Sequence, residues 1–288
     1  MSELLRGFRP EVARRIADVV VDGAAVGAEQ RRVAVFDFDN TCIWGDIGEL
    51  FSYWLIEKMA YRFDLDAFWA LIDDADGCAE IREMVHALEA MDPDDDDYEP
   101  LYARYRAEMT AIYPRMLLRE GKAAAYAWAV RLHVGLREDE MAEMSYSCIV
   151  REWSRAPHTE TFSTRRGEDL VVESGIRPFE AIAGAMRHLE ERGWEVWIVS
   201  ATNAWTVEVA AKLLFDIPPD RVVGNRVTTI GDELTDVLVE PALFRAGKVA
   251  AIEREIGARP RIVFGDSETD LEMMPWASQL AVLIDHGD

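Results

Sequence analysis

Four short runs of apolar residues, each stopping abruptly at a glycine or polar residue, are the feature that most limits the fold of this chain. They cover residues 33–36, 196–199, 262–264 and 280–284. The first stops at Asp37, the second at Ser200, and the third at Gly265 followed by Asp266. Short continuous runs that are rich in β-branched residues predict strands buried on both faces.

Segments with helical periodicity lie between these runs. Apolar residues recur at a spacing of about 3.6 between residues 179 and 189, and Gly193 is a typical C-terminal stop. Residues 205–214 and 248–256 predict two further helices. Strands that alternate with helices of this length predict an α/β fold with a doubly wound, parallel sheet.

Residues 47–155 differ from the rest because they lack a convincing strand. An apolar helical stripe opens the segment, at Ile47, Leu50, Phe51, Trp54 and Leu55. Further helices are expected at 79–91, 99–118, 121–134 and 138–154. We therefore divide the chain into an N-terminal helix packed on the core (1–30), an α/β core domain (31–45 and 170–288) and an inserted α-helical domain (46–169).

Four consecutive aspartates at 94–97 interrupt this helical region. We interpret them as a solvated loop between two helices. The alternative is a calcium site, but the segment lacks the glycine and the terminal glutamate of an EF-hand loop.

The charge balance excludes several classes of partner. Of 288 residues, 31 are Lys or Arg and 54 are Asp or Glu, so the formal net charge is −23. A chain this acidic repels nucleic-acid backbones and anionic membranes unless it has a basic patch, and no dense Lys/Arg run occurs. No apolar run approaches the roughly 20 residues that span a bilayer. We expect neither a nucleic-acid nor a membrane partner, and nothing in the sequence specifies an oligomeric state.

The cysteines and the N-terminal segment both favour a cytoplasmic protein. Cys42, Cys78 and Cys148 are widely spaced and odd in number, so we expect structural thiols and neither a disulfide framework nor a zinc site. Residues 16–28 superficially resemble a signal segment, but Asp18 interrupts them, and we predict an amphipathic helix.

Carboxylates follow two of the predicted strands. Residues 37–41 read Asp-Phe-Asp-Asn-Thr, and residues 266–270 read Asp-Ser-Glu-Thr-Asp. Ligands of open α/β sheets bind beyond the carboxyl ends of the strands, so these side chains are expected to converge. Several converging carboxylates need a hard divalent cation, and oxygen ligands favour Mg²⁺ over Zn²⁺. A magnesium site of this kind suits phosphoryl chemistry.

Ser200 and Lys248 add a hydroxyl and a cation to the same set. A hydroxyl at a strand end, beside the amides of a following helix, can hold phosphate oxygens. Lysine offers a compact positive charge for those oxygens. Only four of the 31 basic residues are lysines, although a lysine alone is more often a solvated surface charge.

Together, these four segments resemble the signature motifs of haloacid-dehalogenase-superfamily phosphatases. DFDNT at 37–41 is similar to the first motif, the apolar run ending in Ser200 to the second, Lys248 to the third and GDSETD at 265–270 to the fourth. The resemblance covers residues 33–43 and 175–285. It is strongest to phosphoserine-phosphatase-like and phosphocholine-phosphatase-like members, which have an inserted α-helical C1 cap.

The resemblance implies a role for each matching residue. Asp37 would be the nucleophile that forms an aspartyl-phosphate, and Asp39 the general acid and base. Phosphate oxygens would be held by Thr41, Ser200 and Lys248. Magnesium would be bound by the carboxylates of Asp37 and Asp266 and the backbone carbonyl of Asp39, with support from Asp270. The implied function is Mg²⁺-dependent hydrolysis of a small phosphorylated metabolite. A phosphotransferase and an inactive binding protein on the same scaffold are the alternatives.

The second motif departs from the phosphoserine phosphatase pattern. Ala201-Thr202-Asn203 follows Ser200 where those enzymes tend to have glycines, and the insertion is larger than a minimal cap. Both differences favour a phosphocholine-like substrate over phosphoserine.

Candidate substrate-binding residues follow the first motif. Three could project over the site: Trp44, Asp46 and Glu49. With aromatic residues further along, they could form a cage for a quaternary ammonium group; the aromatic residues are Tyr53, Trp54, Tyr61 and Trp69. Packing within the helical domain is the alternative for them. Arg82 could meet a substrate carboxylate, although a solvated helix face is the more common setting. The five histidines match no motif.

Overall fold

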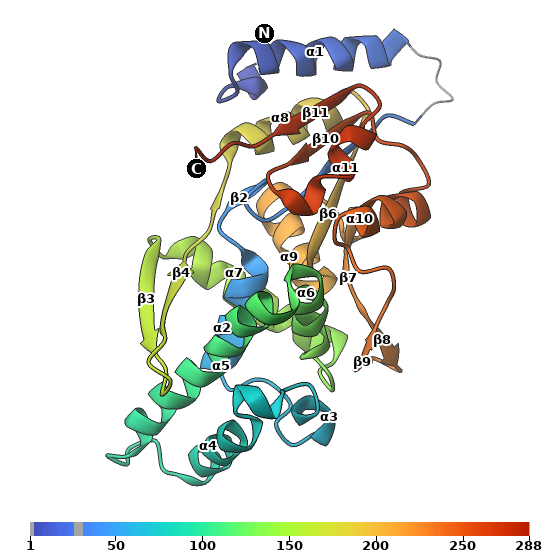
Figure 1. The fold of residues 1–288 in the computed structure, drawn as a ribbon. Coiled ribbons are helices and arrows are strands. Elements are labelled where there is room, and N and C mark those ends of the chain that lie inside the picture. The colour runs from blue at the N-terminus through green and yellow to red at the C-terminus, as the bar shows by residue number, and fades with distance from the viewer. Residues whose placement is uncertain (1–2, 26–30, 288) are drawn as a thin grey trace. The chain divides into compact units, whose positions relative to one another are not determined.

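The computed structural model describes residues 3–25 and 31–287, which form two compact units (Figure 1). The α/β unit contains the chain up to Gly48, Ile176–Asn225 and the chain from Glu240 onward. The helical unit contains Glu49–Gly175 and Arg226–Val239. None of the helices among the described residues is long and apolar enough to cross a bilayer.

A parallel sheet forms the centre of the α/β unit. Within the described residues its strand order is β11-β10-β1-β6-β7. The strands are β1 (Val33–Phe36), β6 (Glu195–Asn203), β7 (Val222–Asn225), β10 (Ile262–Gly265) and β11 (Leu280–Leu283). Phe36 of β1 lies opposite Ile198 of β6 and Phe264 of β10, and all neighbours are parallel. The prediction of a doubly wound parallel sheet is confirmed. The short edge strand β7 was not predicted.

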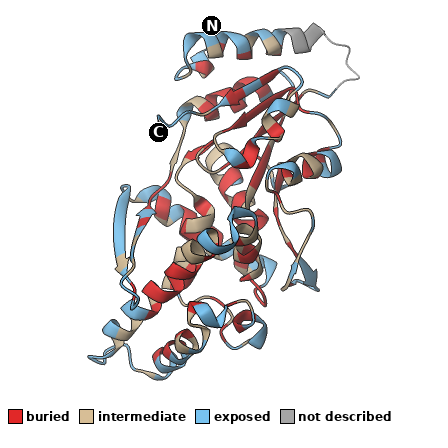
Figure 2. Cartoon of the chain, viewed as in Figure 1, coloured by how far each residue is buried: buried red, intermediate tan, exposed pale blue. Residues whose placement is uncertain are grey.

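Both faces of this sheet are covered, which explains the continuous apolar runs (Figure 2). On one face, Val35 and Val263 pack against Ile252 and Met273. On the other face, the Phe36 and Phe264 rings stack with centroids 4.1 Å apart. Because neither face meets water, a polar residue at every second position would bury polar groups without partners. Accordingly, β1 and β10 contain no polar side chain.

Three helices of the α/β unit lie close to the predicted segments 179–189, 205–214 and 248–256, whereas several short helices were not predicted. The helices of this unit are η1 (Glu3–Leu5), α1 (Pro10–Ala25), α8 (Glu180–Glu190), α9 (Ala204–Phe215), η3 (Pro219–Arg221), α10 (Ala246–Ala251), the π-helical turn η4 (Ile252–Ile256), η5 (Glu268–Asp270) and α11 (Met273–Trp276). A short antiparallel pair, β2 (Ile43–Trp44) with β5 (Arg177–Pro178), completes the unit. Helix α1 contacts β11 and buries Ala13, Ile16 and Val20. Residues 26–30 of the predicted N-terminal segment lie outside the described residues.

The helical unit contains hairpins as well as helices. Its helices are α2 (Ile47–Glu57, which begins in the α/β unit), α3 (Asp66–Trp69), η2 (Asp74–Asp76), α4 (Cys78–Ala90), α5 (Tyr98–Glu120), α6 (Lys122–Arg131) and α7 (Glu138–Ser154). The hairpins are β3 (His158–Ser163) with β4 (Asp169–Ser174), and β8 (Val227–Ile230) with β9 (Glu233–Leu238). The second hairpin is anchored to the loop after α6, where Gly135 N donates to Leu234 O at 2.8 Å.

The observed units therefore divide the chain at other residues than the expected boundaries at 46 and 169. Residues 170–175 and 226–239 lie with the helical unit, and residues 46–48 lie with the α/β unit. The expected insertion is not purely helical, because β3 falls inside it. The sequence of β3 shows no alternation of apolar and polar residues, because most of its residues are exposed on both faces.

The aspartates at 94–97 form the expected exposed loop between α4 and α5. Asp92 and Asp95 accept backbone N–H groups two residues ahead, from Asp94 and Asp97, at 3.0 and 3.1 Å. Across residues 3–25 and 31–287, the only group of three or more acidic, histidine or cysteine ligands that converges on one point lies elsewhere. These contacts are ordinary Asx turns, and the calcium alternative has no support.

Candidate functional site

The carboxyl ends of β1 and β10 bring the first and fourth sequence motifs together. Asp37 follows β1 directly, and its backbone N–H donates to Phe264 O of β10 at 3.0 Å. Because parallel strands end at the same edge, Asp37 and the segment after Gly265 share that edge. The Asp37 side chain is buried.

Lys248 of α10 joins the two motifs by a pair of short ionic hydrogen bonds. Its Nζ donates to Asp37 Oδ1 at 2.6 Å and to Asp270 Oδ1 at 2.7 Å. Its side chain is fully buried. Burial opposes the charged form, but the two facing carboxylates outweigh it and raise the pKa of Lys248. A buried, permanently charged lysine is thus aimed at the end of β1.

Asp270 accepts hydrogen bonds from this lysine and from the backbone. Its Oδ2 accepts the backbone N–H groups of Asp266 at 3.2 Å and of Ser267 at 3.4 Å. Asp270 therefore fixes both the turn that carries Asp266 and the position of Lys248.

Three carboxylates lie close to one another, and two of them bind Lys248. One oxygen from each of Asp37, Asp266 and Asp270 lies within 4.8 Å of the others. Burial raises the pKa of Asp37 well above its usual range, although Lys248 opposes this. Burial, and then the charge of Asp270, raise the pKa of Asp266. This set of oxygen ligands carries more negative charge than Lys248 balances, which fits a hard divalent cation such as Mg²⁺.

Asp39 is a second, separate carboxylate with its own hydrogen-bond donors. Its Oδ1 accepts Ile47 N–H at 2.7 Å, and its Oδ2 accepts Thr202 Oγ1–H at 2.8 Å and Ser200 Oγ–H at 3.3 Å. Burial, followed by the charge of Asp46, raises the pKa of Asp39 to about 8. A carboxyl group with this pKa holds its proton near neutral pH and can donate it.

The remaining predicted residues divide between the two units. Thr41 Oγ1 donates to Asp266 Oδ1 at 3.2 Å, inside the site. Trp44 lies on β2 opposite Arg177, and Asp46 lies in the same unit, close enough to act on Asp39. Glu49 lies in the helical unit instead, where Tyr53 Oη donates to it at 3.3 Å.

The structure corrects the expected position of Ser200 and adds a residue. Strand β6 does not end at Ser200 but continues to Asn203, which caps α9 by accepting Thr206 N–H at 2.9 Å. Thr202, noted in the sequence only as a departure from glycine, contacts Asp39 more closely than Ser200 does. Only the sequence position, two residues after Ser200, could have indicated it.

Most of the candidate cage is core packing of the helical unit. Tyr61 and Trp69 are buried, and their rings contact Phe68 at centroid distances of 5.2 Å each. Trp54 stacks on Phe51 of the same helix. Arg82 lies over the Trp69 ring at 5.5 Å and also pairs with Asp66. The cage hypothesis is wrong for Tyr61 and Trp69.

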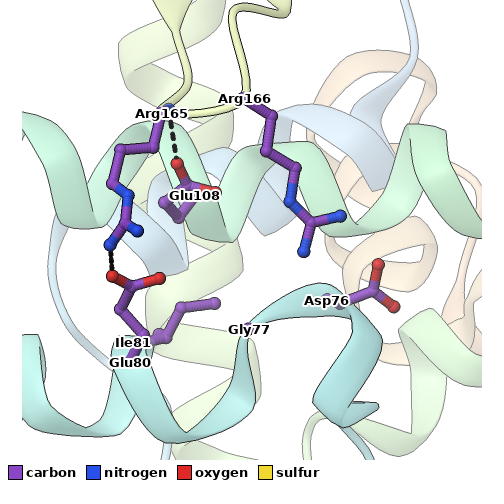
Figure 3. A pocket seen from close by; sticks show the side chains of 7 residues that line it. All are labelled: Asp76, Gly77, Glu80, Ile81, Glu108, Arg165 and Arg166. Atoms are coloured by element: carbon purple, nitrogen blue, oxygen red, sulfur yellow. Dashed lines mark hydrogen bonds and ion pairs between the residues drawn. The ribbon is translucent and has the colours of Figure 1, made fainter.

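A polar pocket within the helical unit is a separate feature. Its volume is about 220 Å³ (Figure 3). It is lined by Asp76, Gly77, Glu80, Ile81, Glu108, Arg165 and Arg166. Arg165 forms an ion pair with Glu80, and its backbone N–H donates to Glu108 at 2.7 Å. Asp76 accepts from Arg119 at 3.1 Å. Arg166 donates to a backbone carbonyl, Ala75 O, so not every charge in the pocket meets an opposite charge.

Gly265 lies close against the side chain of Asp270, and its replacement tests that contact directly. A Cβ atom at this position would lie 2.6–2.9 Å from three side-chain atoms of Asp270. We expect Gly265→Ala to push Asp270 away from Lys248 and to lower the free energy of unfolding by about 1–3 kcal/mol, the usual cost of overpacking. Urea unfolding measures this effect, and an unchanged midpoint would contradict the close approach.

A parallel α/β sheet with aspartates and a buried lysine beyond its strand ends defines an α/β enzyme with a polar, charged site. A sequence profile of the haloacid dehalogenase-like hydrolases matches residues 101–275. The chain therefore belongs to this hydrolase family, as the four motifs indicated. The matched region contains Ser200, Lys248 and Asp266, whereas the first motif precedes it.

Two solved structures show the same fold. A conserved functionally unknown protein from Anaerococcus prevotii DSM 20548 superposes with a TM-score of 0.79 at 19% identity, covering 95% of this chain and 85% of its own. A protein of unknown function from Bordetella pertussis Tohama I has a TM-score of 0.53 at 14% identity, covering 87% and 89%. A phospho-aspartyl intermediate analogue of phosphoserine phosphatase is more distant, with a TM-score of 0.42 at 14% identity, covering 88% and 86%. No curated protein matches the chain.

Proposed function

We propose that this hydrolase cleaves small phosphomonoesters with Mg²⁺ as its cofactor and an aspartyl-phosphate at Asp37 as the intermediate. The observation that carries the proposal is the buried Lys248, which donates to Asp37 Oδ1 at 2.6 Å and so fixes one oxygen while the other remains to attack. A general acid, Asp39, lies two residues further along the same loop.

In the first half-reaction, an oxygen of Asp37 forms a bond to phosphorus and the bond from phosphorus to the ester oxygen breaks. The electron pair of that bond goes to the leaving oxygen, which takes the proton held by Asp39. Lys248, Thr41 and Ser200 bind the phosphoryl oxygens as charge shifts onto them.

In the second half-reaction, water attacks the phosphorus of the aspartyl-phosphate. Asp39, now ionised, takes a proton from this water, and the bond between Asp37 and phosphorus breaks. Phosphate leaves, Asp37 is a carboxylate again and Asp39 is protonated again. Each proton that is given is thus recovered within one cycle.

Magnesium would be held by the carboxylates of Asp37 and Asp266 and the backbone carbonyl of Asp39. When bound, it neutralises phosphate charge that would otherwise repel the attacking carboxylate. In the free protein the Thr41 hydroxyl, which would turn to phosphate in the complex, donates to Asp266 Oδ1 at 3.2 Å, and Asp270 fixes the backbone of the same turn.

We assign the helical unit the role of a cap. The candidate substrate contacts are Glu49 of that unit together with Trp44 and Asp46 of the α/β unit, and two of the three are acidic. Acidic side chains would favour a phosphomonoester that carries a cationic group, as phosphocholine does, and phosphoserine is the second candidate. Three unpaired cysteines support a reducing compartment, and we place the enzyme in the cytoplasm.

Phosphate release from a panel of phosphomonoesters tests the proposal. The panel contains phosphocholine, phosphoethanolamine, phosphoserine and sugar phosphates, each assayed with Mg²⁺ and with a chelator. Chelation is expected to lower the rate by about 100-fold or more, because several kcal/mol of charge stabilisation are lost. Activity that is indifferent to the chelator would contradict the metal assignment.

Two other outcomes separate the alternatives. Phosphate transferred to an added alcohol instead of water would identify a phosphotransferase. A chain that binds phosphomonoesters but neither releases nor transfers phosphate, with any divalent cation, would be a binding protein.

A further inference from the structure

Thr202 makes the shorter of the two hydroxyl contacts to the candidate general acid. Its Oγ1 donates to Asp39 Oδ2 at 2.8 Å, whereas Ser200 Oγ lies 3.3 Å from the same oxygen. Ile47 N–H holds the other oxygen, Oδ1, at 2.7 Å. The carboxyl group is therefore clamped at both oxygens, and its plane is set by groups on two different elements.

The rotamer of Thr202 depends on the absence of a side chain at Gly48. A Cβ atom on Gly48 would lie 2.6 Å from Thr202 Oγ1 and 3.0 Å from Thr202 Cγ2. Both branches of the threonine thus lie against this glycine. Gly48 is in the first turn of α2, where alanine would ordinarily stabilise the helix.

We propose that Thr202 is a positioning residue that holds Asp39 for proton transfer to the leaving oxygen, and that Gly48 provides the space for it. This inference rests on the proposed function. It also explains the second motif, because a threonine occupies the position where phosphoserine-phosphatase-like enzymes tend to have glycine.

Because Thr202 holds Asp39, Ser200 is available to bind phosphate. Thr202 N–H donates to Ser200 Oγ at 3.1 Å, so the serine oxygen is oriented by the backbone of the residue that holds Asp39. The serine hydroxyl can turn from its longer contact with Asp39 to a phosphoryl oxygen without releasing the acid. The two hydroxyls thereby divide phosphate binding and acid positioning between them.

A positioning role has a chemical signature. A poor leaving group, such as the alkoxide of an alkyl phosphate, needs the proton from Asp39 as the bond to phosphorus breaks. A good leaving group, such as p-nitrophenolate, needs it much less. Loss of Asp39 positioning therefore slows the first half-reaction of alkyl phosphates selectively, whereas general damage to the site slows both.

The test measures the first-turnover rate of alcohol release by Thr202→Val, with an alkyl phosphate and with p-nitrophenyl phosphate. Valine keeps the shape and removes the hydroxyl. We expect the rate for the alkyl ester to fall by about 10- to 100-fold, part of the usual contribution of a general acid, with KM little changed. The rate for p-nitrophenyl phosphate is expected to fall by less than about threefold. Thr202→Ser should restore the alkyl rate.

Two further variants keep the test independent of folding defects. Gly48→Ala is expected to reproduce the signature of Thr202→Val by displacing the threonine, with some loss of thermal stability from overpacking that the ratio of the two ester rates does not depend on. Thr159→Val makes the same chemical change on an exposed position of β3 and should behave as the wild type. Equal loss for both esters, or no loss for either in an otherwise active enzyme, would overturn the role of Thr202. A wild-type chain without phosphatase activity would overturn the proposed function itself.

Discussion

Replacement of Asp37 by asparagine is expected to lower phosphate release by about 10⁴-fold or more, the scale seen when a catalytic nucleophile is removed. The amide oxygen does not attack phosphorus to give a stable acyl phosphate, so the first half-reaction has no nucleophile. Asparagine keeps the size of the side chain and an oxygen that can accept from Lys248 Nζ, which now donates to Asp37 Oδ1 at 2.6 Å. The fold is expected to survive.

Phosphate release with Mg²⁺ at saturating substrate measures this effect, and the circular dichroism spectrum verifies the fold. Asp285→Asn is a matched control, because Asp285 also follows a strand of the sheet, β11, yet its side chain is 63% exposed. Asp285→Asn is expected to retain wild-type activity. Substantial activity of Asp37→Asn would sink the aspartyl-phosphate mechanism.

The core of the α/β unit could be predicted because its physical causes are local in the sequence. Strands β1 and β10 are buried on both faces, which leaves no polar alternation, and each ends where a polar residue or glycine follows. Parallel strands bring their carboxyl ends to one edge, so the order of motifs along the chain was enough to bring Asp37 and Asp266 together.

The detailed roles within the site were harder to predict because they depend on tertiary contacts. The sequence allowed Asp270 to support either the metal or the lysine, and the structure shows it bonded to Lys248 Nζ and to the backbone of Asp266. Thr202 carried no helical or strand signal of its own. Its contact with Asp39 exists because β6 continues past Ser200 and Gly48 leaves space beside it.

The boundaries of the two units also could not be predicted from local sequence patterns. Residues 226–239 follow a strand of the α/β sheet, yet the β8–β9 hairpin is held by the helical unit. Leu234 N donates to Leu136 O at 2.8 Å, a pairing between segments about one hundred residues apart. Periodicity reports which side of an element is buried, but not which distant segment covers it.

Replacement of Lys248 is expected to have the second large effect, on both stability and catalysis. Lys248→Met keeps most of the apolar stem and removes the only cation that donates hydrogen bonds to Asp37 and Asp270 among the described residues. Breaking a buried ion pair by removing one partner costs about 3–5 kcal/mol of unfolding free energy. Phosphate-ester binding is expected to weaken as well, because the phosphoryl oxygens lose their charged partner. The corresponding changes at exposed Lys58, Lys122 and Lys212 are the controls and should each cost less than about 0.5 kcal/mol.

The loss at Lys248 should depend on pH in a direction that identifies its cause. Burial already raises the pKa of Asp37 in the folded protein, and Lys248 opposes that rise, so its removal raises this pKa further. A group whose pKa is higher in the folded state binds more protons there than in the unfolded state, and stability then falls as pH rises from about 4, the pKa of an unfolded aspartate. Measured in a chelator by urea unfolding, the deficit of Lys248→Met relative to the wild type should therefore grow with pH once Asp37 ionises in the folded wild type. A deficit that shrinks as the pH rises would contradict this cause.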